Sequence, residues 1–183
     1  MKRAKKVLIL RFSSFGDIAI MIPVLRALSK QYPNVEFNLA SRPKMAPLFE
    51  EFVNINFISL DIENDYKGLN GIYKLFKILK LIKPTHIADL HFVIRTRVIG
   101  LLFKILGYKV KSIDKGRRQK KALTRIRNKH FEPLTPTVFR YSKVFSKLGF
   151  SIDITKNELS HNNSLPENLK EVFYSDKKKM DRN

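Results

Sequence analysis

The stretch from Val7 to Leu28, VLILRFSSFGDIAIMIPVLRAL, constrains the fold of this chain more than any other. It begins with a short apolar run, passes through a polar loop that contains one glycine, and reaches an acid at Asp17. Apolar residues then recur at helical spacing, at positions 18, 21, 22, 25 and 28. The pattern predicts a buried parallel strand over Val7–Arg11, a tight turn, and a helix over Ile18–Gln31.

Strands and helices alternate along the rest of the chain. The patterns predict strands over Val35–Ala40, Ile55–Leu60, His86–Leu90 and Tyr108–Ile113, and helices over Pro43–Phe52, Leu69–Ile82, Arg95–Leu106 and Val138–Leu148. Lys115–Pro136 has no clear pattern, although Ala122–Asn128 can form a short helix. This alternation implies βαβ units with right-handed crossovers, so the predicted fold is α/β, a Rossmann-like doubly wound parallel sheet.

Length and composition suit one domain with a real core. The chain has 183 residues, of which 44% are hydrophobic and 14 are Phe. We expect one Rossmann-like domain over residues 1–156 and a polar tail over residues 157–183. The chain contains no Cys, which excludes disulfides and fits a reducing compartment. Its apolar runs fall short of the roughly 18–20 residues that a membrane span needs.

The charge is strongly unbalanced. Lys and Arg number 36 against 16 Asp and Glu, for a formal net charge of +20. Residues 104–149 alone hold 14 Lys or Arg against two acids, Asp114 and Glu132. Such a balance predicts a polyanionic partner: nucleic acid, an anionic membrane surface or a phosphorylated glycan. The clustering predicts a local basic face.

Asp17 allows two interpretations. It can cap the N-terminus of the following helix, because a carboxylate accepts hydrogen bonds from the unpaired backbone N–H groups there. It can also act as a general base on a sugar hydroxyl, since a helix N-terminus keeps a carboxylate ionised. Spacing alone favours the cap, and the two roles can coexist.

Two further polar clusters follow predicted strands. The run Lys115, Arg117, Arg118, Lys120 and Lys121 is the densest charge cluster, and it is either a solvated loop or an anion-binding loop. Asp89, His91, Arg95 and Arg97 lie near the end of the fourth strand, at the edge where α/β sheets bind ligands. The plain alternative is that Asp89 or His91 is a cap and that the arginines are exposed helix residues.

Several common sites are not predicted. The loop Phe12–Gly16 is not GxGxxG, no P-loop lysine motif occurs, and GxSxG is absent, so neither a cofactor site nor a catalytic triad is indicated. The four His, at 86, 91, 130 and 161, lack the spacing of metal ligands, so we expect no metal site.

Residues 7–28 resemble the N-terminal signature of the lipopolysaccharide heptosyltransferases, glycosyltransferase family 9. The agreement is carried by Ser13, Ser14, Gly16, Asp17, Pro23, Leu25, Arg26, Ala27 and Leu28. DLHFVIRTRVIG at 89–100, IDKGRRQKKALTR at 113–125 and the helix from Arg140-Tyr141 to Leu148-Gly149 are also similar to middle segments of that family. The resemblance spans roughly residues 5–155.

The resemblance implies a GT-B fold, in which two Rossmann-like domains face each other across a cleft. The N-terminal domain holds the acceptor, lipid A carrying Kdo, and the C-terminal domain holds ADP-heptose. Transfer inverts the anomeric centre without a metal or other cofactor, and the matching Asp17 acts as general base. The acceptor-binding residues implied in this chain are Ser13, Ser14, Gly16, His91, Arg95, Lys115, Arg117, Arg118, Lys120 and Lys121.

Members of that family are much longer than this chain. We therefore expect the acceptor half alone, with the donor domain absent and residues 157–183 as the truncated start of the interdomain region. Activity of this chain alone is doubtful, because half a cleft cannot position both substrates. The expected partners are the lipopolysaccharide core acceptor and the anionic inner face of the bacterial inner membrane, which the protein touches peripherally from the cytoplasm.

Two other functions remain open. The first is a non-enzymatic polyanion-binding module for nucleic acid or anionic lipid headgroups, which the net charge of +20 favours. It ranks second because no RNP-type aromatic motif, zinc finger or clear recognition helix is visible. The other is a plain nucleotide-binding Rossmann domain, and it ranks last because its glycine fingerprint is missing.

Overall fold

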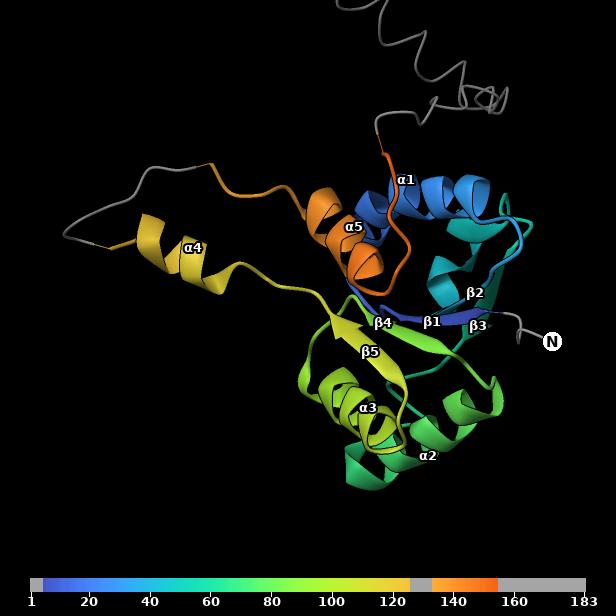
Figure 1. Cartoon of the computed structure of the whole chain (residues 1–183). Helices are drawn as coiled ribbons and strands as arrows, with labels where there is room; N and C mark the ends of the chain where they lie inside the picture. The colour runs from blue at the N-terminus through green and yellow to red at the C-terminus, as the bar shows by residue number, and fades with distance from the viewer. Residues whose placement is uncertain (1–4, 126–132, 155–183) are drawn as a thin grey trace, which may run out of the picture.

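A computed structural model of the chain describes residues 5–125 and 133–154. Within these residues the chain forms one parallel sheet in the order β3-β2-β1-β4-β5 (Figure 1). The strands are β1 (Lys6–Leu10), β2 (Glu36–Ser41), β3 (Ile55–Ser59), β4 (His86–Asp89) and β5 (Lys109–Ser112). The predicted α/β fold with a doubly wound parallel sheet is therefore confirmed.

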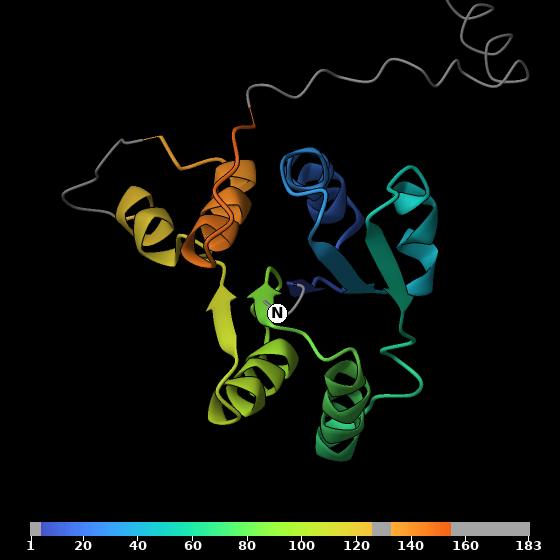
Figure 2. The same cartoon turned by 45° about the vertical axis from the view of Figure 1, so that its right-hand side comes forward.

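Helices cover both faces of the sheet. One face carries α1 (Phe15–Gln31), α5 (Thr137–Lys147) and the short 3-10 helix η1 (Pro43–Phe49), and the other carries α2 (Gly68–Leu81) and α3 (Ile94–Ile105) (Figures 1 and 2). The remaining helix, α4 (Arg117–Leu123), projects away from the sheet and buries none of its residues. In the part of the chain that the structure describes, no helix is long and apolar enough to cross a membrane.

The core has two halves, one on each face, and β1 contributes to both. Val7 and Ile9 pack into the cluster under α1 and α5, whereas Leu8 and Leu10 pack into the cluster under α2 and α3. Successive side chains of a strand point to opposite faces, so a strand covered on both sides must be apolar throughout. This requirement explains the uninterrupted apolar run from Val7 to Leu10.

Three predicted elements differ from the structure in type or by more than one residue at an end. The first helix begins at Phe15, three residues earlier than predicted, because Ser14 serves as its N-cap. The segment predicted as a helix over Pro43–Phe52 is the 3-10 helix η1, in which Pro47 lacks the N–H group that an α-helix would use at this position. The short helix suggested for Ala122–Asn128 is wrong, because α4 occupies Arg117–Leu123; residues 126–128, like the domain boundary predicted at 156, lie outside the described residues.

Candidate active site

The winding of the sheet reverses beside β1. The chain runs outward from β1 through β2 to β3 and then returns to place β4 on the other side of β1. In open α/β sheets, ligands bind outside the carboxyl ends of the strands at such a switch point. The loops that follow β1 and β4 meet there: Ser13 Oγ lies 3.2 Å from His91 Nε2, and the Arg11 guanidinium donates a hydrogen bond to the carbonyl oxygen of Leu90.

Asp17 is held at this edge through one of its two carboxylate oxygens. Its Oδ2 forms an ion pair with the buried guanidinium of Arg11 and accepts a hydrogen bond of 2.9 Å from Ser14 Oγ. Oδ1 accepts no hydrogen bond from any residue that the structure describes. The side chain of Asp17 is 41% exposed, against 7% for Arg11. One oxygen is thus fixed, and the other is open to a ligand.

The N-cap interpretation of Asp17 is wrong. Ser14 is the N-cap, and Asp17 is the third residue of α1, where its carboxylate pairs with the cap residue in a capping box. Gly16 lies between them, exposed, with no atom within 4 Å of where a Cβ would stand.

The electrostatic surroundings keep Asp17 ionised. Burial opposes its charge, but the hydrogen bond from Ser14 and the positive charge of Arg11 outweigh burial and hold the pKa of Asp17 below its usual range. The carboxylate can therefore accept a proton at neutral pH.

Tyr141 fixes this arrangement from α5. Its hydroxyl donates a hydrogen bond of 3.2 Å to the backbone carbonyl oxygen of Asp17, and its ring centroid lies 5.8 Å from the Arg11 guanidinium carbon. Burial raises the pKa of Tyr141 to about 12, so its hydroxyl remains a donor. The first turn of α1 is thereby tied to a helix more than a hundred residues later.

Asp17 lines a cavity of about 460 Å³. Its charged lining consists of Arg11, Asp17, Lys115, Lys120 and Arg140. The remaining lining residues are Ile113, Leu134, Thr135, Pro136, Thr137 and Tyr141. Two lysines of the predicted basic loop therefore share a cavity with the predicted base. Burial and the nearby charges of Arg11 and Arg117 lower the pKa of Lys115.

The other predicted basic residues lie around neighbouring cavities. Arg95 and Arg117 line a cavity of about 840 Å³ and Arg118 lines one of about 390 Å³, and Lys115 borders both. Lys121 is exposed and lines none of these three cavities. The structure thus brings Lys115 and Lys120 to the cavity of Asp17, places Arg95, Arg117 and Arg118 at neighbouring cavities, and leaves Lys121 outside all three.

The turn after β4 is shaped by Asp89. This residue is fully buried, and its Oδ1 accepts hydrogen bonds from the backbone N–H groups of His91 (3.0 Å) and Phe92 (2.8 Å). Its interpretation as a helix cap is wrong, because Val93 is the N-cap of α3 and Asp89 holds the turn before it. Burial raises the pKa of Asp89. Burial and the cations Arg11 and Lys115 lower the pKa of His91 to about 4, so this imidazole is neutral at pH 7.

Three residues of this site were missed from the sequence, Arg11, Arg140 and Tyr141. Arg11 carries a local signal, because a charged residue directly after a buried apolar strand stands at the ligand edge of a sheet. Tyr141 carries none, because it shares the helical spacing of the core residues Val144, Phe145 and Leu148. Among the residues that the structure describes, no group of three or more His, Cys, Asp or Glu could hold a metal ion.

The amino-acid sequence matches no protein-family model and no curated protein. The fold, however, is similar to that of solved glycosyltransferases. The E. coli heptosyltransferase WaaC with ADP is 18% identical with a TM-score of 0.56, over 84% of this chain and 49% of that one. The same enzyme with ADP-2-deoxy-2-fluoro heptose is 16% identical with a TM-score of 0.58, over 84% of this chain and 50% of that one. The family 9 glycosyl transferase from Veillonella parvula DSM 2008 is 18% identical with a TM-score of 0.62, over 94% of this chain and 49% of that one.

These similarities establish the fold. The chain has the Rossmann-like half of a GT-B fold, as predicted. It spans about half the length of each of these solved structures. At this level of identity the similarity concerns the fold alone.

Proposed function

We propose that this chain is the acceptor-binding half of an inverting glycosyltransferase that transfers heptose from ADP-heptose to the inner core of lipopolysaccharide. The observation that carries the proposal is the ionised, half-exposed carboxylate of Asp17 at the switch point of the sheet, in a cavity that Lys115 and Lys120 also line. The heptosyltransferase fold of WaaC, solved with ADP and with an ADP-heptose analogue, supports the choice of donor.

In this proposal Asp17 takes the proton of the acceptor hydroxyl on Oδ1, while Arg11 and Ser14 hold Oδ2. The acceptor oxygen attacks the anomeric carbon from the face opposite ADP, and a new C–O bond forms. The bond from that carbon to the phosphate oxygen breaks, and ADP leaves with the electron pair. Attack from the opposite face inverts the anomeric centre. A positioned base contributes about 10²–10⁴-fold to such a step.

The charge of the cavity supports an acidic acceptor. Lys115 and Lys120 put two ammonium groups on the lining, and the guanidinium of Arg140 adds a third cation. Carboxylates and phosphates, which Kdo and lipid A carry, are the groups that such cations bind. Because the chain spans about half the length of the WaaC structures, we place the ADP-heptose site on a second domain that faces this edge.

A domain chimera tests the proposal. Residues 1–156 are joined to the donor half of the E. coli heptosyltransferase, and transfer from ADP-heptose to Kdo-bearing lipid A is measured by mass spectrometry. The natural acceptor half, rejoined to the same donor half, is the positive control. We expect transfer, and we expect Lys115→Gln with Lys120→Gln to raise the KM for the acceptor at least about tenfold with little change in kcat. A folded chimera that transfers no heptose while the positive control does would refute the proposal.

A binding comparison separates this function from a general polyanion-binding module. At physiological salt, the full chain is titrated with the lipopolysaccharide core and with duplex DNA. We expect the core to bind more tightly, and its binding to weaken when Lys115 and Lys120 are replaced. Tighter binding of DNA, with an affinity that falls steeply with salt, favours the polyanion-binding module instead.

A further inference from the structure

The helix α4 has little of its own to hold it in place. It spans Arg117–Leu123 and buries none of its residues, and a helix this short is marginal in water without support from the rest of the protein. Residues 115–125 contain Lys or Arg at six positions and no acid, so charge within this segment is repulsive. Yet Lys120, in the middle of α4, lines the cavity of Asp17. Another part of the chain therefore has to fix α4 beside that cavity.

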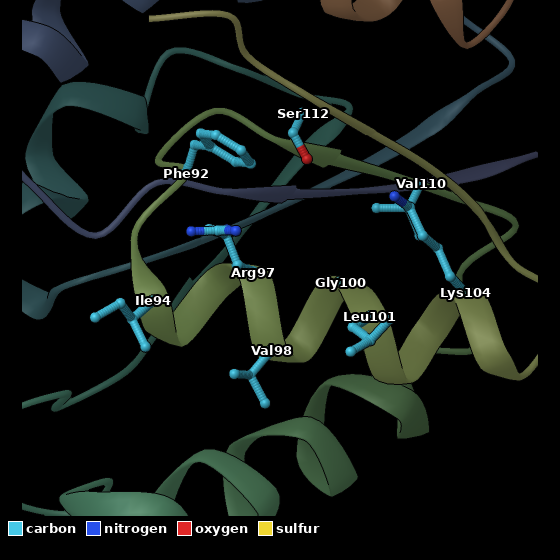
Figure 3. Close-up of a pocket in the computed structure, with 9 residues that line it drawn as sticks. All are labelled: Phe92, Ile94, Arg97, Val98, Gly100, Leu101, Lys104, Val110 and Ser112. Carbon is cyan, nitrogen blue, oxygen red and sulfur yellow. The ribbon is translucent and has the colours of Figure 1, made fainter.

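The α3 side of the sheet does not supply this support. Figure 3 shows a cavity of about 460 Å³ there, between α3 and the edge strand β5. Its lining residues belong to α3, to β5 and, with Phe92, to the turn after β4, and none of them belongs to α4. The support has to come from the other face of the sheet, where α5 lies (Figures 1 and 2).

Arg140, near the start of α5, contacts this segment with its guanidinium. Its Nη1 donates a hydrogen bond of 3.1 Å to the carbonyl oxygen of Asp114, and its Nη2 donates one of 2.8 Å to Oε1 of Gln119. Its Nε donates a third, of 2.8 Å, to the carbonyl oxygen of Thr135. One side chain thus joins the loop after β5, the helix α4 and the segment before α5. Among the residues that the structure describes, the bond to Gln119 is the one hydrogen bond that joins α4 to another element.

Gly116 is shaped for this contact. A Cβ at position 116 would lie 1.8 Å from Nη1 of Arg140, so the guanidinium occupies the space that any other residue would fill. All three acceptors of Arg140 are uncharged oxygens, and none of the ion pairs in the described residues includes it. The bridge is therefore made without neutralising the positive charge that Arg140 brings to the cavity of Asp17.

We propose that Arg140 is a positioning residue that fixes α4 to α5 and so holds Lys115 and Lys120 on the lining of the Asp17 cavity. Lys115 follows Asp114 directly, and Lys120 follows Gln119, so each lysine is one residue from an atom that Arg140 binds. The planar fork of a guanidinium suits such a bridge, because it presents several donors in a fixed geometry. The next residue, Tyr141, binds the backbone of Asp17. The first turns of α5 therefore set the base and the two lysines relative to each other.

The consequence for the acceptor rests on the proposed function. With α4 released, Lys115 and Lys120 no longer meet the acidic groups of the acceptor together, so the affinity for the acceptor falls. Proton transfer at Asp17 is unaffected, because Arg11 and Ser14 still hold its carboxylate. The position of α4 itself does not rest on the proposed function, and it can be measured without any substrate.

Distances between spin labels test the position of α4 on the full chain. The chain contains no Cys, so Lys121→Cys with Lys147→Cys gives one label on α4 and one on α5, both at exposed positions. We expect a narrow distance distribution by double electron–electron resonance, which Arg140→Met broadens at least about twofold. Lys30→Cys with Lys147→Cys, on α1 and α5, is the control pair, and its unchanged distribution shows that the domain has kept its fold. An unchanged distribution between α4 and α5 in Arg140→Met would overturn the proposal.

Two further variants separate the bridge from its charge. Gln119→Ala removes the acceptor on α4 without changing any charge, and Gln119 does not line the cavity of Asp17, so we expect the same broadening. Arg140→Lys keeps the charge but lacks the planar fork, so the broadening should persist. Lys143→Met removes an exposed cation from the next turn of α5 and should leave the distribution unchanged. Narrow distributions in both Gln119→Ala and Arg140→Lys would mean that charge alone places α4, and they would contradict the proposal.

The split between KM and kcat in the domain chimera gives the functional readout. We expect the KM for the acceptor to rise at least about tenfold in Arg140→Met and at least about threefold in Gln119→Ala, with kcat within about twofold of the unsubstituted chimera. Lys143→Met should change neither constant. An unchanged KM in Gln119→Ala, although α4 has been released, would contradict the positioning of the two lysines. A chimera that transfers no heptose would refute the proposed function, whereas the distance distributions would still decide how α4 is held.

Discussion

The cationic surroundings of His91 make the stability of the fold depend on pH. Burial and the charges of Arg11 and Lys115 lower the pKa of His91 to about 4, against about 6.5 in an unfolded chain. Between these two values the unfolded chain binds a proton at this position and the folded chain does not. The free energy of unfolding therefore falls as pH drops through this window. At neutral pH, His91 is neutral in both states and hardly changes the free energy of unfolding.

The size of this effect follows from the two pKa values. The pKa of His91 falls from 6.5 to about 4, a difference of about 2.5, and each pKa unit corresponds to about 1.4 kcal/mol. His91 therefore lowers the free energy of unfolding by about 3 kcal/mol at about pH 4 and by about 2 kcal/mol at about pH 5. A small domain has a total stability of about 5–15 kcal/mol, so the loss is easily measured.

Urea unfolding of the wild type and of His91→Gln, each at about pH 7 and about pH 5, isolates this contribution. Glutamine keeps a hydrogen-bonding group near Ser13 but cannot take up the proton. From about pH 7 to about pH 5, we expect the free energy of unfolding of the wild type to fall by about 2 kcal/mol more than that of the variant. The difference isolates His91, because the two proteins share all other titrating groups. Parallel pH dependence of the two proteins would show that the imidazole does not sit in a buried, cationic setting.

Three further changes probe the same edge. Arg11→Met should raise the pKa of Asp17 toward or above its usual range, as a carboxyl titration by nuclear magnetic resonance can measure; an unchanged value would mean that the ion pair does not hold the carboxylate. Tyr141→Phe should lower the free energy of unfolding by about 0.5–1.5 kcal/mol in urea, and no loss would mean that its hydroxyl does not bond to the backbone of Asp17. Gly116→Ala should cost about 1–2 kcal/mol, because the residue has a φ of 62° and a Cβ would overlap the Arg140 guanidinium; a neutral variant would contradict that contact.

Local patterns were sufficient to predict the sheet. The strands are short apolar runs bounded by turns, and this pattern arises because both faces of a parallel sheet are buried. The location of Asp17 followed for the same reason, because a polar loop after the first such strand has to lie at the ligand edge. In the strands and the longer helices only the ends shifted, as for α1, whose first turn has no apolar periodicity of its own.

What the sequence could not supply are contacts between distant residues. Arg11 forms a hydrogen bond with Leu90, 79 residues away, and Tyr141 forms one with Asp17, 124 residues away. Neither contact can be predicted from the local periodicity of the sequence. The helix α4 also escaped prediction, because it buries none of its residues and so shows no apolar stripe. Its Arg, Gln, Lys, Ala and Leu residues are all good helix formers, which is the signal that was overlooked.

The most direct measurement of the central claim is the kcat of the domain chimera that carries Asp17→Asn, at saturating ADP-heptose and saturating Kdo-bearing lipid A. The amide has nearly the shape of the carboxylate but cannot accept the proton, and Asp65→Asn supplies the same substitution at an exposed acid away from the site. We predict that Asp17→Asn lowers kcat by about 10²–10⁴-fold with the dissociation constant of the acceptor little changed, while Asp65→Asn has no effect. A kcat within about twofold of the unsubstituted chimera would contradict the assignment of Asp17 as the base.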